Sequence, residues 1–169
     1  ISILSESKAA MEFLTPLESR KSYQLEYEGL TDHHGNKMHQ KRYFVFHNDF
    51  IPEPVGGDLM ITEIMSDPDP AVALPGAEYI EIWNSLTTPL RLTGLKISDG
   101  SRLSSPIEDF VAEAGQKIIL CAAEDSLQFK PFGITIGLGN MPSFNNDGDL
   151  VLLYGRDNGL LDQVSYTPE

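Results

Sequence analysis

The stretch Glu78-Tyr79-Ile80-Glu81-Ile82-Trp83-Asn84 decides the fold, because aromatic and β-branched residues dominate it, as is typical of a β-strand. Further strand candidates are residues 59–65, 92–98, 116–122, 150–154 and 161–166, and turn sequences separate them: Asp99-Gly100, Ala114-Gly115, Asp147-Gly148 and Asn158-Gly159. Many short strands with such turns predict an all-β fold, either a β-sandwich or a small barrel. A single helical turn is expected around residues 124–129.

Charge and composition divide the chain near Pro52. Residues 1–52 carry 6 basic and 7 acidic side chains (net −1), whereas residues 53–169 carry 6 and 18 (net −12). An excess of acid argues against nucleic-acid and anionic-membrane binders, which need a basic surface. Direct membrane insertion is not expected, because no apolar run reaches about 18 residues. The segment 51–57, Ile-Pro-Glu-Pro-Val-Gly-Gly, predicts an interdomain linker, since it continues neither a strand nor a helix.

Residues 58–169 resemble the lamin tail domain, an immunoglobulin-like β-sandwich found in nuclear lamins and in many bacterial secreted proteins. Five stretches carry the resemblance in order: Leu59-Met60-Ile61-Thr62-Glu63-Ile64-Met65, the stretch 78–84, Leu92-Thr93-Gly94-Leu95-Lys96-Ile97-Ser98-Asp99-Gly100, Gly148-Asp149-Leu150-Val151-Leu152-Leu153 and Leu161-Asp162-Gln163-Val164-Ser165-Tyr166. The loop Ser66-Asp67-Pro68-Asp69-Pro70, between the first two of these stretches, resembles bacterial members of the family. The resemblance implies a non-catalytic module with no defined ligand.

Residues 1–50 resemble the C-terminal half of a bacterial Ig-like domain, through the run Tyr23-Gln24-Leu25-Glu26-Tyr27-Glu28-Gly29-Leu30-Thr31-Asp32-His33-His34-Gly35-Asn36-Lys37-Met38. Strands are expected at 10–14, 22–30 and 41–47. About three strands leave apolar edges and faces uncovered. We therefore expect this segment to be ordered and to pack either on the second domain or on another copy, as a homodimer.

Glu63 and Glu81 interrupt apolar rows of two predicted strands. Because every second residue of a strand faces the same side, Glu63 is expected on the face of Leu59, Ile61 and Met65. Glu81 is likewise expected on the face of Tyr79 and Trp83. Each acid could simply accept backbone hydrogen bonds or face water. If the two converged, they could instead form a carboxylate pair for acid–base chemistry or a metal. Trp83 and Tyr79 are either core residues or a platform on which a sugar stacks.

The loop Asn145-Asn146-Asp147-Gly148-Asp149 is rich in oxygen ligands of the kind that calcium prefers, and Asp67 and Asp69 could join it. It lacks the spacing of an EF-hand loop, and Asp147-Gly148 is also typical of a tight turn. We expect turn chemistry here and no bound cofactor. Calcium held by Asp67, Asp69, Asn145, Asp147 and Asp149 is the alternative.

No motif for nucleophilic, phosphate-binding or zinc chemistry occurs, and Cys121 lies in the apolar run 117–122 as a buried small side chain. The chain begins at Ile1, so we take it as a fragment of a longer protein. The leading hypothesis is a non-catalytic interaction or spacer module of a secreted or cell-surface bacterial protein, binding protein or glycan. The alternative is an accessory domain of an extracellular hydrolase whose catalytic domain lies outside this fragment.

Overall fold

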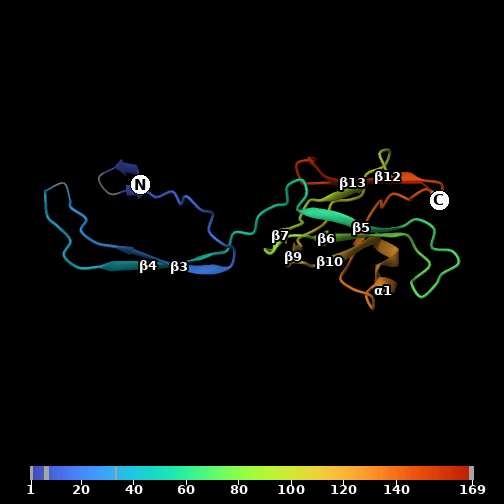
Figure 1. Ribbon diagram of the computed structural model, residues 1–169, viewed down its shortest axis with the longest axis horizontal. Coiled ribbons are helices and arrows are strands. Elements are labelled where there is room, and N and C mark those ends of the chain that lie inside the picture. Colours follow the sequence, from blue (N-terminus) through green and yellow to red (C-terminus); the bar gives the residue numbers. More distant parts are fainter. Residues whose placement is uncertain (1, 6–7, 33, 168–169) are drawn as a thin grey trace. The chain divides into compact units, whose positions relative to one another are not determined.

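A computed structural model of the chain describes residues 2–5, 8–32 and 34–167 (Figure 1). The chain forms two compact units, Ile1–Ile51 and Pro52–Glu169. The predicted linker segment, residues 51–57, divides between them. In the second unit the Pro52 carbonyl accepts a hydrogen bond from Arg91 N (2.8 Å), and Gly57 N donates to the Leu161 carbonyl (3.1 Å). Residues 52–57 are thereby attached to the second unit.

Strands make up nearly all of the regular secondary structure in the described part of the second unit, as predicted. Its described residues form a four-stranded sheet in the order β11-β10-β6-β5, a three-stranded sheet in the order β13-β12-β8, and the small pair β7-β9. The strands are β5 (Leu59–Met65), β6 (Tyr79–Asn84), β7 (Leu90–Arg91), β8 (Lys96–Ser98), β9 (Val111–Ala112), β10 (Lys117–Ala122), β11 (Thr135–Leu138), β12 (Asp149–Tyr154) and β13 (Leu160–Tyr166). The all-β expectation for this part of the chain is confirmed.

Alternation along the strands builds the core between the two larger sheets. Ile80 and Ile82 of β6 point inward from the four-stranded sheet, and Val151 and Leu153 of β12 point inward from the three-stranded sheet. All four are buried in one hydrophobic cluster, because every second residue of a strand faces the same side. Figure 1 shows β12 and β13 in one layer and β6 and β10 in the other.

A β-bulge in β5 corrects the predicted position of Glu63. Ile61 pairs with Ile82 and Glu63 pairs with Glu81, so Thr62 is an extra residue with no partner of its own. A bulge of this kind shifts the alternation by one residue. Ile61 and Ile64 therefore pack on the core, whereas Glu63 lies on the outer face with Glu81. The expectation that Glu63 shares a face with Leu59 and Ile61 is wrong.

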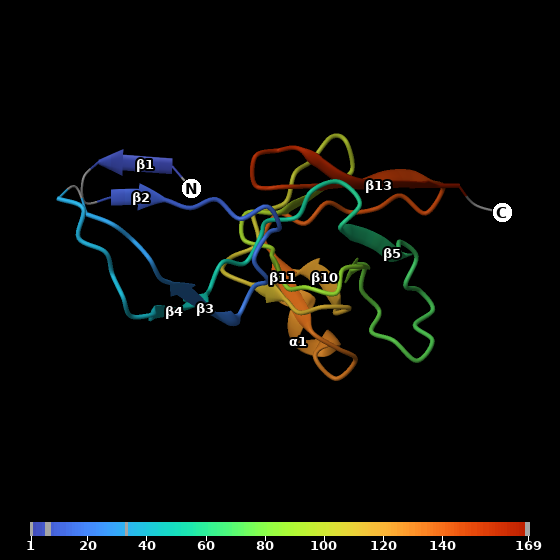
Figure 2. The same ribbon diagram turned by 60° about the vertical axis from the view of Figure 1, so that its left-hand side comes forward.

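The expected helical turn links β10 to β11. It consists of a 3-10 turn, η1 (Ala123–Asp125), followed by α1 (Ser126–Phe129), and it returns the chain so that β11 runs parallel to β10. Figure 2 shows this short helix against β10 and β11. Phe129 is fully buried, and its ring meets that of Tyr79 edge-on at 5.2 Å. In the part of the chain that the structure describes, no helix has the length and apolar character of a membrane span.

The described residues of the first unit form two pairs of antiparallel strands. β1 (Ser2–Ser5) pairs with β2 (Lys8–Ala10), and β3 (Lys21–Tyr27) pairs with β4 (Arg42–Asn48). The strands expected at 22–30 and 41–47 correspond to β3 and β4. The strand expected at 10–14 is wrong beyond Ala10, because residues 11–14 pair with no strand in the described structure. None of the described residues from 10 to 51 is buried, so this stretch has no buried core of its own.

Candidate functional site

Glu63 and Glu81 face each other across β5 and β6, but their carboxylates bind different partners. The Tyr79 hydroxyl donates a short hydrogen bond to Glu63 Oε1. Glu81 Oε1 accepts from Thr62 Oγ1 and from Lys117 Nζ, both at 2.7 Å. The two acids are neighbours in register, as a carboxylate pair requires, yet each is held by its own donors on the outer face of the sheet.

These contacts set the protonation of the outer face. Burial alone would raise the pKa of Glu81, but the hydrogen bonds from Lys117 and Thr62 outweigh it and hold that pKa below its usual value. Burial, together with the Glu63 carboxylate, raises the pKa of Tyr79 well above its usual value. Glu81 is therefore ionised and Tyr79 is neutral at pH 7, which suits an ion pair and a donated hydrogen bond rather than proton transfer.

Trp83 lies on the same outer face and is half-buried. Its indole Nε1 donates to the Gly115 carbonyl at 3.2 Å, and its neighbours across the sheet are Met60 of β5 and Lys117 of β10. The ring is thus tied to the turn before β10 along its polar edge. A sugar platform needs an exposed ring face, and only part of this ring is exposed.

The acids that could bind calcium lie in two different loops, and Asp149 serves the turn at the start of β12. Asn145 N and Nδ2 both donate to Asp149 Oδ2 at 3.0 Å, while Asp149 Oδ1 accepts from Leu150 N at 2.8 Å. Asp147 lies in the same turn and is exposed. Asp67 and Asp69 are exposed in the proline-rich loop after β5, where Asp67 lines a small pocket with Pro68 and Val72. Among the described residues, no group of three or more His, Cys, Asp or Glu side chains could hold a metal ion.

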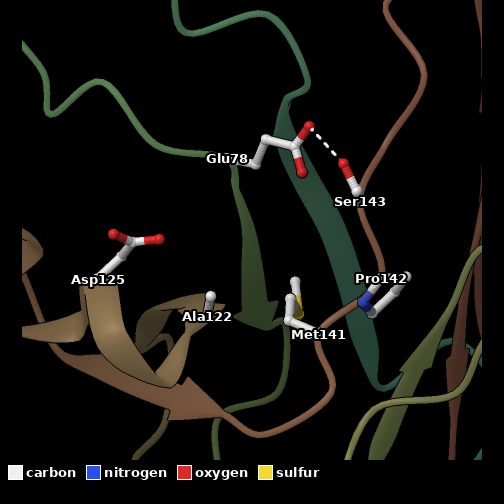
Figure 3. A pocket seen from close by; sticks show the side chains of 6 residues that line it. All are labelled: Glu78, Ala122, Asp125, Met141, Pro142 and Ser143. Carbon is white, nitrogen blue, oxygen red and sulfur yellow. Dashed lines mark hydrogen bonds between the residues drawn. The ribbon is translucent and has the colours of Figure 1, made fainter.

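A separate pocket of about 230 Å³ brings together residues from three distant segments. Glu78 precedes β6, Ala122 and Asp125 lie at the end of β10 and in η1, and Met141, Pro142 and Ser143 follow β11. Figure 3 shows Asp125 on the helical side and Glu78 beside Ser143, with Ala122 and Met141 between them. We call these six residues the acidic pocket.

The carboxylates of the acidic pocket are held in place by local donors. Ser143 Oγ donates to Glu78 Oε1 at 3.1 Å, and Phe144 N donates to Glu78 Oε2 at 3.2 Å. Gln128 Nε2 donates to Asp125 Oδ1 at 2.9 Å. The walls between them are apolar, formed by Ala122, Met141 and Pro142. Two anchored carboxylates above an apolar floor suit a side chain that has an aliphatic stem and a cationic head.

Cys121 precedes Ala122 in β10, and its surroundings agree with the expected buried small side chain. It is fully buried in a small cluster with Tyr79 and Phe129. Burial, with the nearby charges of Asp125 and Glu124, raises the pKa of the Cys121 thiol to about 11. Because the thiolate is the reactive form, this thiol is unreactive in the folded chain.

Reasoning from the sequence missed the acidic pocket. By sequence, Glu78 is the first residue of a predicted strand, and no motif includes Asp125 or Ser143. The three residues lie 47 and 18 positions apart in the chain. The alternation of residues along a strand does not reveal which loops meet in the fold, so no local signal in the sequence marked these three residues.

Comparison with known proteins supplies the family. The model of the Lamin Tail Domain family matches residues 52–168, well over half of the chain. No curated protein matches the chain. The match leaves out the first unit, whose likeness to a bacterial Ig-like domain stays a prediction.

Proposed function

This chain belongs to the lamin tail domain family, and on that basis we propose that its second unit is a non-catalytic module that binds a protein partner. We place it within a larger secreted or cell-surface bacterial protein. The partner contributes an arginine or lysine side chain that enters the acidic pocket. The hydrolase-accessory role remains the alternative, and the full reading frame distinguishes the two by an adjacent catalytic domain.

The observation that carries this proposal is the acidic pocket itself. Glu78 and Asp125 line one cavity whose other walls are apolar, and Ser143 and Phe144 fix the direction of the Glu78 carboxylate. A guanidinium or ammonium group pairs with such carboxylates, and its methylene stem covers the apolar wall. The net charge of −12 on residues 53–169 also attracts a basic partner over a longer range.

The outer face of β5, β6 and β10 supports the non-catalytic part of the proposal. Glu63 is bound by Tyr79, and Glu81 is bound by Lys117 and Thr62. An acid–base pair needs one group that can gain and another that can lose a proton near neutral pH. The lowered pKa of Glu81 and the raised pKa of Tyr79 move both groups away from that range. A glycan role for Trp83 is less well supported, because that ring is half-buried and tied to Gly115.

The test is calorimetric titration of the full chain with two pentapeptides, Gly-Gly-Arg-Gly-Gly and Gly-Gly-Glu-Gly-Gly. We expect binding of the arginine peptide only, weakened by salt because the contact is ionic. Asp125→Asn should weaken that binding about tenfold, corresponding to ~1.4 kcal/mol. Glu108→Gln is the matched control, since it removes one exposed carboxylate outside the pocket. Equal weakening by both variants, or equal binding of both peptides, contradicts the proposal.

A further inference from the structure

The hairpin β3-β4 forms a two-stranded sheet without a core. No third strand joins it within the described ranges, and both of its outer edges are open there. Tyr23, Leu25, Phe44 and Phe46 lie on one face, where the Tyr23 and Phe46 rings stack at 5.7 Å. A lone two-stranded hairpin is marginally stable in water, whereas a sheet of three or more strands with an apolar face is stable.

The two edges of this hairpin differ in protection. β3 carries Lys21 and Glu26, and each forms an ion pair, with Glu18 and Lys41 respectively. β4 carries Arg42 and His47 near its ends, and His47 Nε2 lies 3.4 Å from Asp49 Oδ1. It has no charged residue from 43 to 46, and Tyr43, Phe44 and Val45 are 65%, 58% and 62% exposed. Edge strands are normally guarded against pairing by charges, prolines or bulges. β4 has none of these between residues 43 and 46.

The second unit contains an edge strand that is protected against pairing with another strand. β5 is the edge strand of its sheet, and Asp162 Oδ2 accepts a hydrogen bond from Ile61 N at 2.7 Å. A carboxylate therefore occupies a backbone donor that an incoming strand would need. The contrast with β4 indicates that the open edge of the first unit is available for pairing.

We propose that β4 pairs antiparallel with β4 of a second copy of this chain, so that two hairpins form one symmetric four-stranded sheet. A two-fold axis perpendicular to the sheet places residues of the same face opposite each other. Of the registers that satisfy this condition, the one centred on Val45 pairs all seven residues of Arg42–Asn48. The residue numbers of each pair then add up to 90.

This register is self-complementary in chemistry and charge. Phe44 lies opposite Phe46 of the second copy, and the two copies of Val45 face each other at the axis. Aromatic and β-branched cross-strand pairs are favourable. Arg42 lies opposite Asn48, so no like charges meet. The first unit carries a net charge of only −1, counted over residues 1–52, so two copies approach there with little repulsion. The inference concerns the first unit and is independent of the acidic pocket.

The first test is the mass of the full chain in solution, measured by light scattering at about 100 μM. We expect twice the 18.7 kDa of one chain. Val45→Lys places two like charges opposite each other at the axis and should give the single-chain mass. Gln24→Lys is the matched control, because Gln24 pairs with Val45 on the same face but belongs to the other edge strand. A wild-type chain that stays monomeric overturns the proposal.

The second test fixes the register by disulfide trapping. Val45→Cys should form a disulfide-linked dimer under mild oxidation, since residues directly opposite in an antiparallel pair have Cα atoms about 4.5–5.5 Å apart. Tyr43→Cys is the matched control on the same face, because its symmetric copy lies about 13 Å away along the strands. The wild-type chain, with only the buried Cys121, should not crosslink. Equal trapping of both variants, or a dimer in which neither is trapped, overturns edge pairing through β4.

Discussion

Asn84 is the side chain whose removal we expect to damage the second unit most clearly. It is fully buried at the end of β6. Its Nδ2 donates to the carbonyls of Thr88 (3.0 Å), Ala112 (3.2 Å) and Glu113 (2.9 Å), and its Oδ1 accepts from Leu86 N (3.1 Å). One amide therefore holds the turn after β6 against β9.

Asn84→Ala leaves these backbone groups without their partner. Each buried unsatisfied group costs ~1–3 kcal/mol, and water or relaxation recovers part of that cost. We expect the free energy of unfolding to fall by about 3 kcal/mol, a large share of the ~5–15 kcal/mol typical of a domain. With a denaturant slope of ~1.5–2 kcal/mol/M, the urea midpoint falls by about 1.5–2 M.

The assay is urea unfolding followed by the fluorescence of Trp83, the single tryptophan, which reports on the second unit. Asn146→Ala is the control, because Asn146 is exposed, and it should change stability by less than ~0.5 kcal/mol. Asn84→Asp places a carboxylate against three carbonyls, which raises its pKa in the folded state. Its stability should therefore recover as the pH falls. A loss below ~0.5 kcal/mol for Asn84→Ala would refute this account of the turn.

Three further predictions concern packing, the outer face and the thiol. Gly137→Ala should lower the free energy of unfolding by ~1–3 kcal/mol, because the added Cβ would lie 2.8 Å from Ala123 Cα. Gly133→Ala should be nearly neutral, because its added Cβ would meet no atom closer than 3.7 Å. Equal urea midpoints for the two variants would contradict this prediction. Lys117→Met should lower the free energy of unfolding by less than ~1 kcal/mol at pH 7. Because the pKa of Glu81 is lowered, that loss should shrink as the pH falls below its usual 4.5, and a loss independent of pH would count against the ion pair. Cys121 should react with iodoacetamide only in denaturant, and rapid labelling of the native chain would show that the thiol is accessible.

The strand at 78–84 and the turns were predictable, because a run of aromatic and β-branched residues and Asp-Gly or Asn-Gly pairs are local signals. The bulge at Thr62 was not predictable, because the regular alternation of strand residues gives no sign of an extra residue. β11 is absent from the predicted strands, and Gly133, Gly137 and Gly139 in and around it weaken the local strand signal. Gly137 is in fact required there by the close approach of η1 to the strand.

The candidate site was less predictable than the fold. Glu63 and Glu81 stand out by sequence, because an acid in an apolar strand is unusual. Their pairing across β5 and β6 depends on the bulge at Thr62 and was not predictable. Their separate partners depend on which way each side chain turns, and sequence does not specify this. The acidic pocket depends on how the loop after β11 folds back beside Glu78 and η1, which is decided by tertiary packing.

The most direct test of the central claim is a two-dimensional ¹H–¹⁵N spectrum of the labelled full chain, titrated with Gly-Gly-Arg-Gly-Gly. We predict that the changes in amide chemical shift concentrate at the acidic pocket, and that the signals of Ala122, Asp125 and Ser143 move most. Trp83 and Glu81 on the outer face of β6 should stay still. Shifts centred on Trp83 and Glu81, or a spectrum that the peptide leaves unchanged, would contradict a protein-binding role for the pocket.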